Sequence, residues 1–199
     1  MQTRSEFLAA GGSALAAAIP STIDTPAPLP SGFALRAFDA ALMVAARHKH
    51  LFTSITDSGD ALGAVRSTIN GYRDVGIAVT DVHAAVVFYH GAAVLNAFDD
   101  GIWNRYVIPS KVLSTNAASG NPMRSEIQGL VTVANVSIFA CNLATHGYAS
   151  KIAKAMRLSA DTVYADMAAH LSPNTMLAPA GVWAIHAIQE RGYTLLQYA

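Results

Sequence analysis

The stretch "SIFACNLATHGYASKIAKAM", residues 137–156, joins two different hydrophobic patterns without a break. Its first part is a short continuous apolar run, which is typical of a strand buried on both faces of a parallel sheet. From Leu143 onward the apolar residues recur at helical spacing. Cys141, the one cysteine of the chain, stands where the predicted strand meets the predicted helix. The stretch therefore predicts a strand–helix unit of an α/β fold with a thiol at the junction.

The same alternation of strands and helices continues on both sides of this stretch. The predicted strands are 50–55, 84–89, 136–140, 175–179 and 193–199. The predicted helices are 34–49, 62–69 with Gly71 as its cap, 123–135, 143–156, 159–171 and 180–190 with Gly192 as its cap. Residues 99–122 carry no regular pattern, so we expect a long functional or mobile loop there. This order predicts an α/β fold with an open, mostly parallel five-stranded sheet and helices on both faces.

Composition limits the classes of function. The chain has 199 residues, of which 52% are hydrophobic and 13% charged, and this suits one globular domain, expected over residues 31–199. Thirteen basic residues balance thirteen acidic ones, so no long-range field favours nucleic acid or an anionic membrane. A single cysteine excludes an intrachain disulfide and every multi-cysteine metal site. We expect no metal and no cofactor, and partners that are small molecules or proteins.

The first thirty residues differ in character from the rest. A short polar start with Arg4 precedes a mildly apolar run, 7–20, and then a proline-rich linker. The run is shorter than the roughly 20 residues that span a bilayer, so residues 1–30 are predicted to be a signal peptide and linker. "TRSEFLAA" is similar to a twin-arginine export signal, although Ser5 stands at the second arginine position. We expect a periplasmic or otherwise exported protein without a membrane span, or a cytoplasmic one if the signal is not functional. An uncleaved N-terminal arm is the alternative.

Cys141 is the leading candidate for chemistry. Function in open parallel sheets gathers at the carboxyl ends of the strands, and the start of a helix stabilises a thiolate through its unpaired N–H groups and dipole. A thiolate can attack a sulfane sulfur and carry it as a persulfide, or form a mixed disulfide. Asn142 and Thr145 are candidates for hydrogen bonds around the sulfur. The alternative is that Cys141 is a buried packing residue, a common fate of free cysteine.

Other candidate groups are weaker. His90 ends the strand 84–89 and could interact with a thiolate or an anion, while Gly91 would let the backbone approach a ligand; a structural histidine is the alternative. The turn 56–60 is predicted to cap a helix rather than bind an anion. The chain has neither a glycine-rich phosphate loop nor a nucleophile-elbow serine motif. The remaining histidines are scattered and predict no metal site: His48, His50, His83, His146, His170 and His186.

Four segments together resemble the DsrE/DsrF-like sulfur-relay family over residues 50–197. They are "HLFTSITDSGDALGAVRSTINGY", "AAVVFYHGAAVLNAF", "VSIFACNLATHGY" and "MLAPAGVWAIHAIQERGYTLLQ". The resemblance implies a flavodoxin-like domain that forms trimers or hexamers. It further implies that Cys141 carries sulfur and that His90 and Gly91 line its pocket. With Asn142 beside the cysteine, we expect His90, Gly91 and Asn142 to be the substrate-binding residues. The chain differs from the family in its longer segment 99–122 and in its expected export.

The sequence thus favours a sulfur carrier or sulfurtransferase-like protein that binds sulfane sulfur as a persulfide on Cys141. Its expected partners are small sulfur compounds or a sulfur-carrier protein. The first alternative is a non-catalytic oligomeric binding or assembly module of the same fold, in which the cysteine is incidental. A histidine-based metal binder is a third.

Overall fold

The five strands form one sheet in which every neighbouring pair is parallel. The computed structural model describes residues 33–114, 119–133 and 135–197, so the expected signal peptide and linker at 1–30 lie outside the described residues. The strands are β1 His48–Ser54, β2 Val82–Phe88, β3 Asn135–Cys141, β4 Thr175–Ala178 and β5 Thr194–Gln197, in the order β4-β3-β2-β1-β5. The expected five-stranded α/β fold is confirmed, and it is consistent with a flavodoxin-like open sheet.

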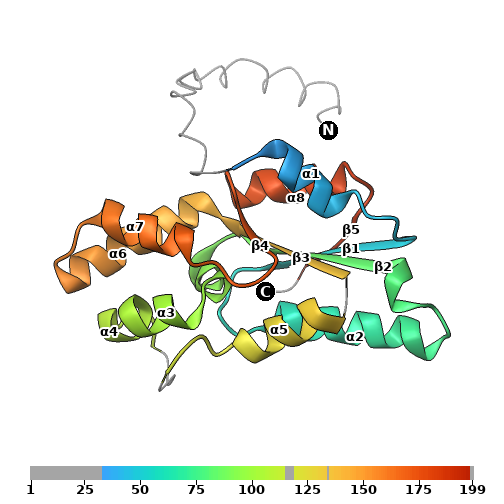
Figure 1. Cartoon of the computed structure of the whole chain (residues 1–199), viewed down its shortest axis with the longest axis horizontal. Helices are drawn as coiled ribbons and strands as arrows, with labels where there is room; N and C mark the ends of the chain where they lie inside the picture. Colours follow the sequence, from blue (N-terminus) through green and yellow to red (C-terminus); the bar gives the residue numbers. More distant parts are fainter. Residues whose placement is uncertain (1–32, 115–118, 134, 198–199) are drawn as a thin grey trace, which may run out of the picture.

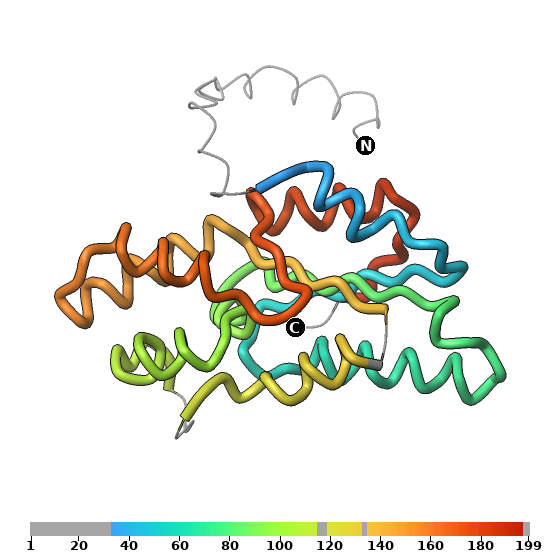
Figure 2. Tube along the Cα trace, in the orientation of Figure 1, coloured from blue at the N-terminus to red at the C-terminus, as the bar shows by residue number. Residues whose placement is uncertain are grey.

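Helices cover both faces of the sheet (Figure 1). On one face lie α1 Leu35–Leu42 and α8 Gly181–Gln189, and on the other α2 Asp60–Asp74 and α5 Arg124–Val133. The remaining segments are η1 Val79–Asp81, η2 Gly91–Ala97, α3 Asp100–Ile102, the π-helical η3 Trp103–Val107, α4 Ile108–Ser110, α6 Asn142–Met156 and α7 Ala160–Ala169. The α6–α7 pair extends beyond the sheet beside the α3–α4 segment, and α4 contacts α6 (Figure 2).

The central strands are apolar because both of their faces are covered. All seven residues of β2 are buried, as the continuous apolar run predicted. Successive side chains point to opposite faces. Val136 and Ile138 of β3 therefore pack with α2 and α5, whereas Phe139 packs between α1 and α8, where Phe38 lies with its ring centroid 4.9 Å away.

Several predicted features of local structure were wrong. The helix expected over 34–49 ends at Leu42, and residues from His48 onward belong to β1. Helix α2 does not stop at Gly71 but runs to Asp74, because Tyr72 in its last turn bonds His50 across the sheet face at 2.9 Å, and the turn follows at Gly76 with φ +82°. The segment 99–122 is not an irregular loop, since residues 100–110 are helical. Asp99 caps this helical segment by accepting from the N–H of Ile102 at 3.0 Å. Its buried side chains fall at helical spacing: Ile102, Trp103, Tyr106 and Val107.

A buried hydrogen-bond network attaches α1 to the amino end of the sheet. His83 on β2 is fully buried, with Nδ1 2.7 Å from the Tyr193 hydroxyl and Nε2 3.2 Å from Ser137 Oγ on β3. Tyr193 and Ser137 also reach the last-turn carbonyls of α1, Leu42 O at 3.0 Å and Ala41 O at 2.9 Å. These carbonyls have no partner inside the helix, so the network supplies what the end of a buried helix needs. Burial, together with the nearby charge of Lys49, lowers the pKa of His83 to about 4.

We expect this histidine to make the fold less stable in mild acid. Between pH 6.5 and about 4, the unfolded chain binds a proton at His83 that the folded chain excludes. The contribution of neutral His83 to the free energy of unfolding should therefore be complete above pH 6.5. On acidification the free energy of unfolding should fall by up to about 1.4 kcal/mol per pH unit. Urea unfolding at pH 7 and pH 5 measures the loss. His83→Asn should reduce it, and the exposed control His186→Asn should not; an equal loss in both variants would contradict the assignment.

Candidate functional site

The carboxyl ends of the strands lie level with one another, so the residues that follow them share one edge. Ser54 of β1 is opposite Phe88 of β2, and Cys141 at the end of β3 is opposite Ala178 of β4. This edge is where open parallel sheets bind ligands. The strand order reverses between β1 and β5, so Cys141 lies two strands from the reversal point.

Cys141 is the N-cap of α6, as the sequence predicted for a residue between strand and helix. Its backbone is extended, and Sγ accepts a hydrogen bond from the N–H of Ala144 at 3.4 Å. The helix that follows is 15 residues long, and its dipole and free N–H groups favour negative charge on the sulfur. Cys141 is only 5% exposed. The position therefore gives the sulfur a backbone donor, but the residue is covered.

The two polar neighbours expected around the sulfur have other partners. Thr145 is fully buried and donates to the backbone carbonyl of Cys141 at 3.0 Å. Asn142 is also buried, and its side-chain oxygen accepts from the Tyr164 hydroxyl of α7 at 2.7 Å. The Tyr164 ring in turn stacks on His146 at 3.6 Å between centroids. Asn142 thus helps to hold α6 against α7, and among the described residues the sulfur has only a backbone donor.

His90 and Gly91 lie at the same edge, but they are not joined to the cysteine. His90 is exposed, and no hydrogen bond or ion pair links it to Cys141. Gly91 has φ +57°, and a Cβ there would lie 2.4 Å from the carbonyl oxygen of Ile55. The backbone does approach closely at this glycine, as expected, but the group that it approaches is the end of β1 rather than a ligand.

The sequence did not predict a close contact beside the strand that carries Cys141. A Cβ on Gly181, the first residue of α8, would lie 2.3 Å from Cβ and 2.6 Å from Cα of Tyr89, which follows β2. Because β3 lies between β4 and β2, this contact passes over the carboxyl end of β3. By strand alternation Cys141 shares with Phe139 the face that α8 covers. The glycine of the "PAGV" segment therefore has a close-packing role.

The turn after β1 brings Asp57 within electrostatic reach of α6. Burial raises the pKa of Tyr148 on α6, and the negative charge of Asp57 adds to this shift. Lys151 lies over the Tyr148 ring at 4.5 Å from its centroid. The N-cap of α2 is Gly59, which lies within the expected capping turn 56–60 but has no side chain to cap with. Ser58 Oγ accepts from the N–H of Asp60 at 3.4 Å and donates to the Asp60 carboxylate at 2.6 Å.

The described residues carry no feature typical of a metal site or a membrane-spanning helix. In 33–114, 119–133 and 135–197, no three His, Cys, Asp or Glu side chains gather as a metal-binding group. His48 and His50 instead lie against Tyr72, with ring centroids 4.5 Å and 5.5 Å away. Over the same residues, no helix has the length and apolar character needed to cross a membrane.

Comparison with known proteins assigns the chain to no family. No protein-family model matches the chain, and no curated protein matches it. A solved structure of a protein of unknown function from Methanobacterium thermoautotrophicum is similar, with a TM-score of 0.41 and 16% identity; the match covers 76% of this chain and 99% of that one. The class defined by fold and edge is thus an open parallel α/β domain with a helix-capping cysteine.

The close packing over β3 predicts a sharp response to one methyl group. Gly181→Ala should lower the free energy of unfolding by about 1–3 kcal/mol, because the new Cβ overlaps Tyr89. Gly147→Ala, in the exposed middle of α6 with nothing within 4 Å, should raise it by about 0.5–1 kcal/mol. Chemical unfolding of both variants measures the difference. A neutral Gly181→Ala would mean that α8 is not tightly packed on Tyr89.

Proposed function

We propose that the protein carries sulfane sulfur as a persulfide on Cys141. The observation that supports this function is the cap geometry, in which Sγ accepts the Ala144 N–H at the start of a 15-residue helix. The same N–H and helix dipole would stabilise the negative charge of a thiolate before transfer and of a persulfide after it. The order of segments that resembles the sulfur-relay family favours the same chemistry.

The proposed step is a sulfur transfer without net oxidation. The Cys141 thiolate attacks the outer sulfur of thiosulfate, an S–S bond forms to the cysteine, and the S–S bond of the donor breaks with sulfite as the leaving group. In the second half-reaction the sulfur passes to the acceptor. A thiolate of the acceptor attacks the outer persulfide sulfur, and Cys141 leaves as a thiolate. No metal or redox cofactor takes part in either half.

Transfer requires the thiol to become reachable. Cys141 is 5% exposed, and the Tyr89–Gly181 contact passes over the strand that carries it. A donor or an acceptor protein must therefore meet a locally opened edge, in which the start of α8 separates from Tyr89. Exposed His90 lies at this edge and is placed to meet an anionic donor as it arrives.

Intact mass spectrometry tests the proposal. After incubation of the folded protein with thiosulfate or polysulfide, we expect the mass of one added sulfur, which dithiothreitol removes. Cys141→Ser should show no addition, since it removes the one cysteine of the chain. The unfolded protein in urea is the positive control for the reagent. Addition only in urea would mean that the folded protein is not a carrier.

The burial of Cys141 favours a second candidate, an assembly module in which the cysteine is incidental. Several apolar side chains at the carboxyl edge are exposed to solvent instead. They are Ile55 at 36%, Leu143 at 52%, Val182 at 58% and Trp183 at 37%. Apolar side chains that gather on a surface mark interaction sites, and a second copy of this chain would cover them.

Light scattering with size-exclusion chromatography tests this candidate. Leu143→Glu should shift an oligomer toward monomer, because a charge would be buried in the contact. Leu158→Glu is the matched control, since Leu158 is 47% exposed but lies between α6 and α7, away from the strand ends. Cys141→Ser should leave the oligomer unchanged. A monomer at all concentrations would exclude the module.

A further inference from the structure

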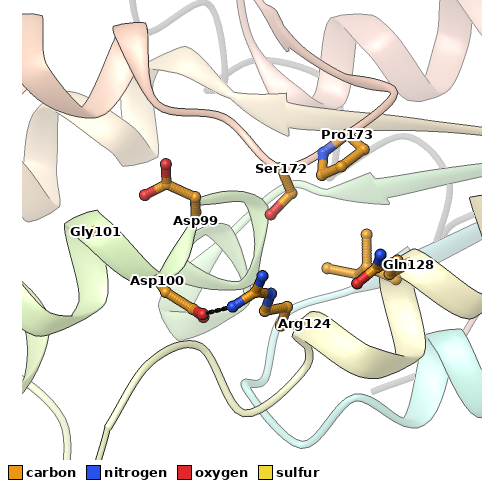
Figure 3. A pocket seen from close by; sticks show the side chains of 8 residues that line it. Asp99, Asp100, Gly101, Arg124, Gln128, Ser172 and Pro173 are labelled. Atoms are coloured by element: carbon orange, nitrogen blue, oxygen red, sulfur yellow. Dashed lines mark hydrogen bonds and ion pairs between the residues drawn. The ribbon is translucent and has the colours of Figure 1, made fainter.

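A cavity of about 280 Å³ lies under the β4 side of the sheet, away from Cys141. It is lined by Asp99, Asp100, Gly101, Arg124, Ile127, Gln128, Ser172 and Pro173, which come from the start of α3, the first turn of α5 and the loop before β4 (Figure 3). Its volume is near the lower end of the range for small-molecule sites. The function proposed for Cys141 uses none of these residues.

The walls of this cavity are fixed before any ligand arrives. The Asn121 side chain donates to the carbonyls of Asn96 at 2.9 Å and Phe98 at 2.7 Å, and its backbone N–H donates to Asp100 at 2.9 Å. Gly120 has φ +65°, and a Cβ there would lie 2.7 Å from the Asp100 carboxylate. These contacts hold the start of α5 against α3.

On the opposite wall, two short backbone bonds join the end of η2 to the loop before β4. Asp99 N donates to His170 O at 3.1 Å, and Ser172 N donates to Ala97 O at 2.8 Å. The two acidic residues and the loop that carries Ser172 are therefore held in place on both sides of the cavity. A site of this kind loses little entropy when a ligand binds.

One polar group in the cavity has no partner. Ser172 is 6% exposed, and its hydroxyl makes no hydrogen bond to any residue that the structure describes. Figure 3 shows this side chain pointing toward the guanidinium of Arg124 across the cavity. The hydroxyl is therefore free to donate one hydrogen bond to a molecule that enters the cavity.

The charges of the lining select the kind of molecule. Arg124 forms an ion pair with Asp100, and its guanidinium has further N–H groups for a second acceptor. Asp99 and Asp100 against one arginine leave the lining with a net negative charge, which opposes a simple anion. A ligand with both a carboxylate and an ammonium group matches the guanidinium of Arg124 and the acidic side chains of the lining. Ile127 and Pro173 offer an apolar surface for a small side chain of the ligand.

We propose that this cavity binds a small α-amino acid with an aliphatic side chain. The carboxylate accepts from Arg124, from the Ser172 hydroxyl and from the Gln128 amide, while the ammonium group lies toward Asp100, whose oxygens keep acceptor capacity. The site is independent of Cys141, so a sensing or storage role would act alongside any chemistry at the carboxyl edge.

Calorimetric titration with three matched probes tests the proposal. L-alanine carries both charges, propionate only the carboxylate, and ethylamine only the ammonium group. We expect alanine to bind with a dissociation constant in about the millimolar range or below, and the two others at least tenfold more weakly. Binding to the Cys141→Ser variant should be unchanged, which separates this test from that of the sulfur carrier.

Two variants and one control assign the binding to the cavity. Ser172→Ala should raise the dissociation constant of alanine about tenfold, as expected for one hydrogen bond to a charged group. Gln128→Leu, at an exposed position that the fold does not need, should act in the same direction if Ser172→Ala does not fold. Ser67→Ala, exposed on α2, is the control. Equal binding of propionate and alanine, no binding of alanine, or binding unaffected by either cavity variant would overturn the proposal.

Discussion

Parallel pairing of the three central strands is the constraint on which the rest of the molecule depends. Because β1, β2 and β3 run in the same direction, every group that follows a strand meets at one edge and every group that precedes a strand meets at the other. The first edge holds Cys141 with the start of α8, and the second holds His83 with its partners. Both faces must then be covered, and this fixes the apolar character of β2.

At the amino edge, the hydrogen bonds outnumber the hydrogens that can make them. Tyr193, neutral His83 and Ser137 supply one hydrogen each, three in all, whereas the contacts among them and to the two carbonyls of α1 number four. A second ring proton would complete the set, but burial and Lys49 oppose it, because placing an unpaired charge in the interior costs more than one hydrogen bond returns. With both hydroxyls donating to the α1 carbonyls, the single ring hydrogen of His83 can serve either Tyr193 or Ser137, so one of these two contacts is left without a hydrogen.

The order of strands and helices could be predicted from the sequence, because hydrophobic periodicity follows from whether an element is buried on one face or on both. The same pattern correctly placed Cys141 at the start of a helix. Contacts between segments far apart in the chain could not be predicted from the sequence. Gly71 resembled a cap, but the bond between Tyr72 and His50 holds the helix beyond it. The spacing of Trp103 and Tyr106 was a usable helical signal in a segment taken as irregular. The close packing of Gly181 on Tyr89 likewise joins a distant pair that no local pattern reveals.

The covering of the single thiol has a kinetic consequence. Since the chain has one cysteine and this residue is only 5% exposed, a thiol reagent in solution reacts chiefly during excursions that open the structure around it. If reclosing is faster than reaction, the observed labelling rate divided by that of an unfolded peptide equals the population of the open form. The cysteine therefore reports how often the structure around the carboxyl end of β3 opens, whatever chemistry the sulfur performs.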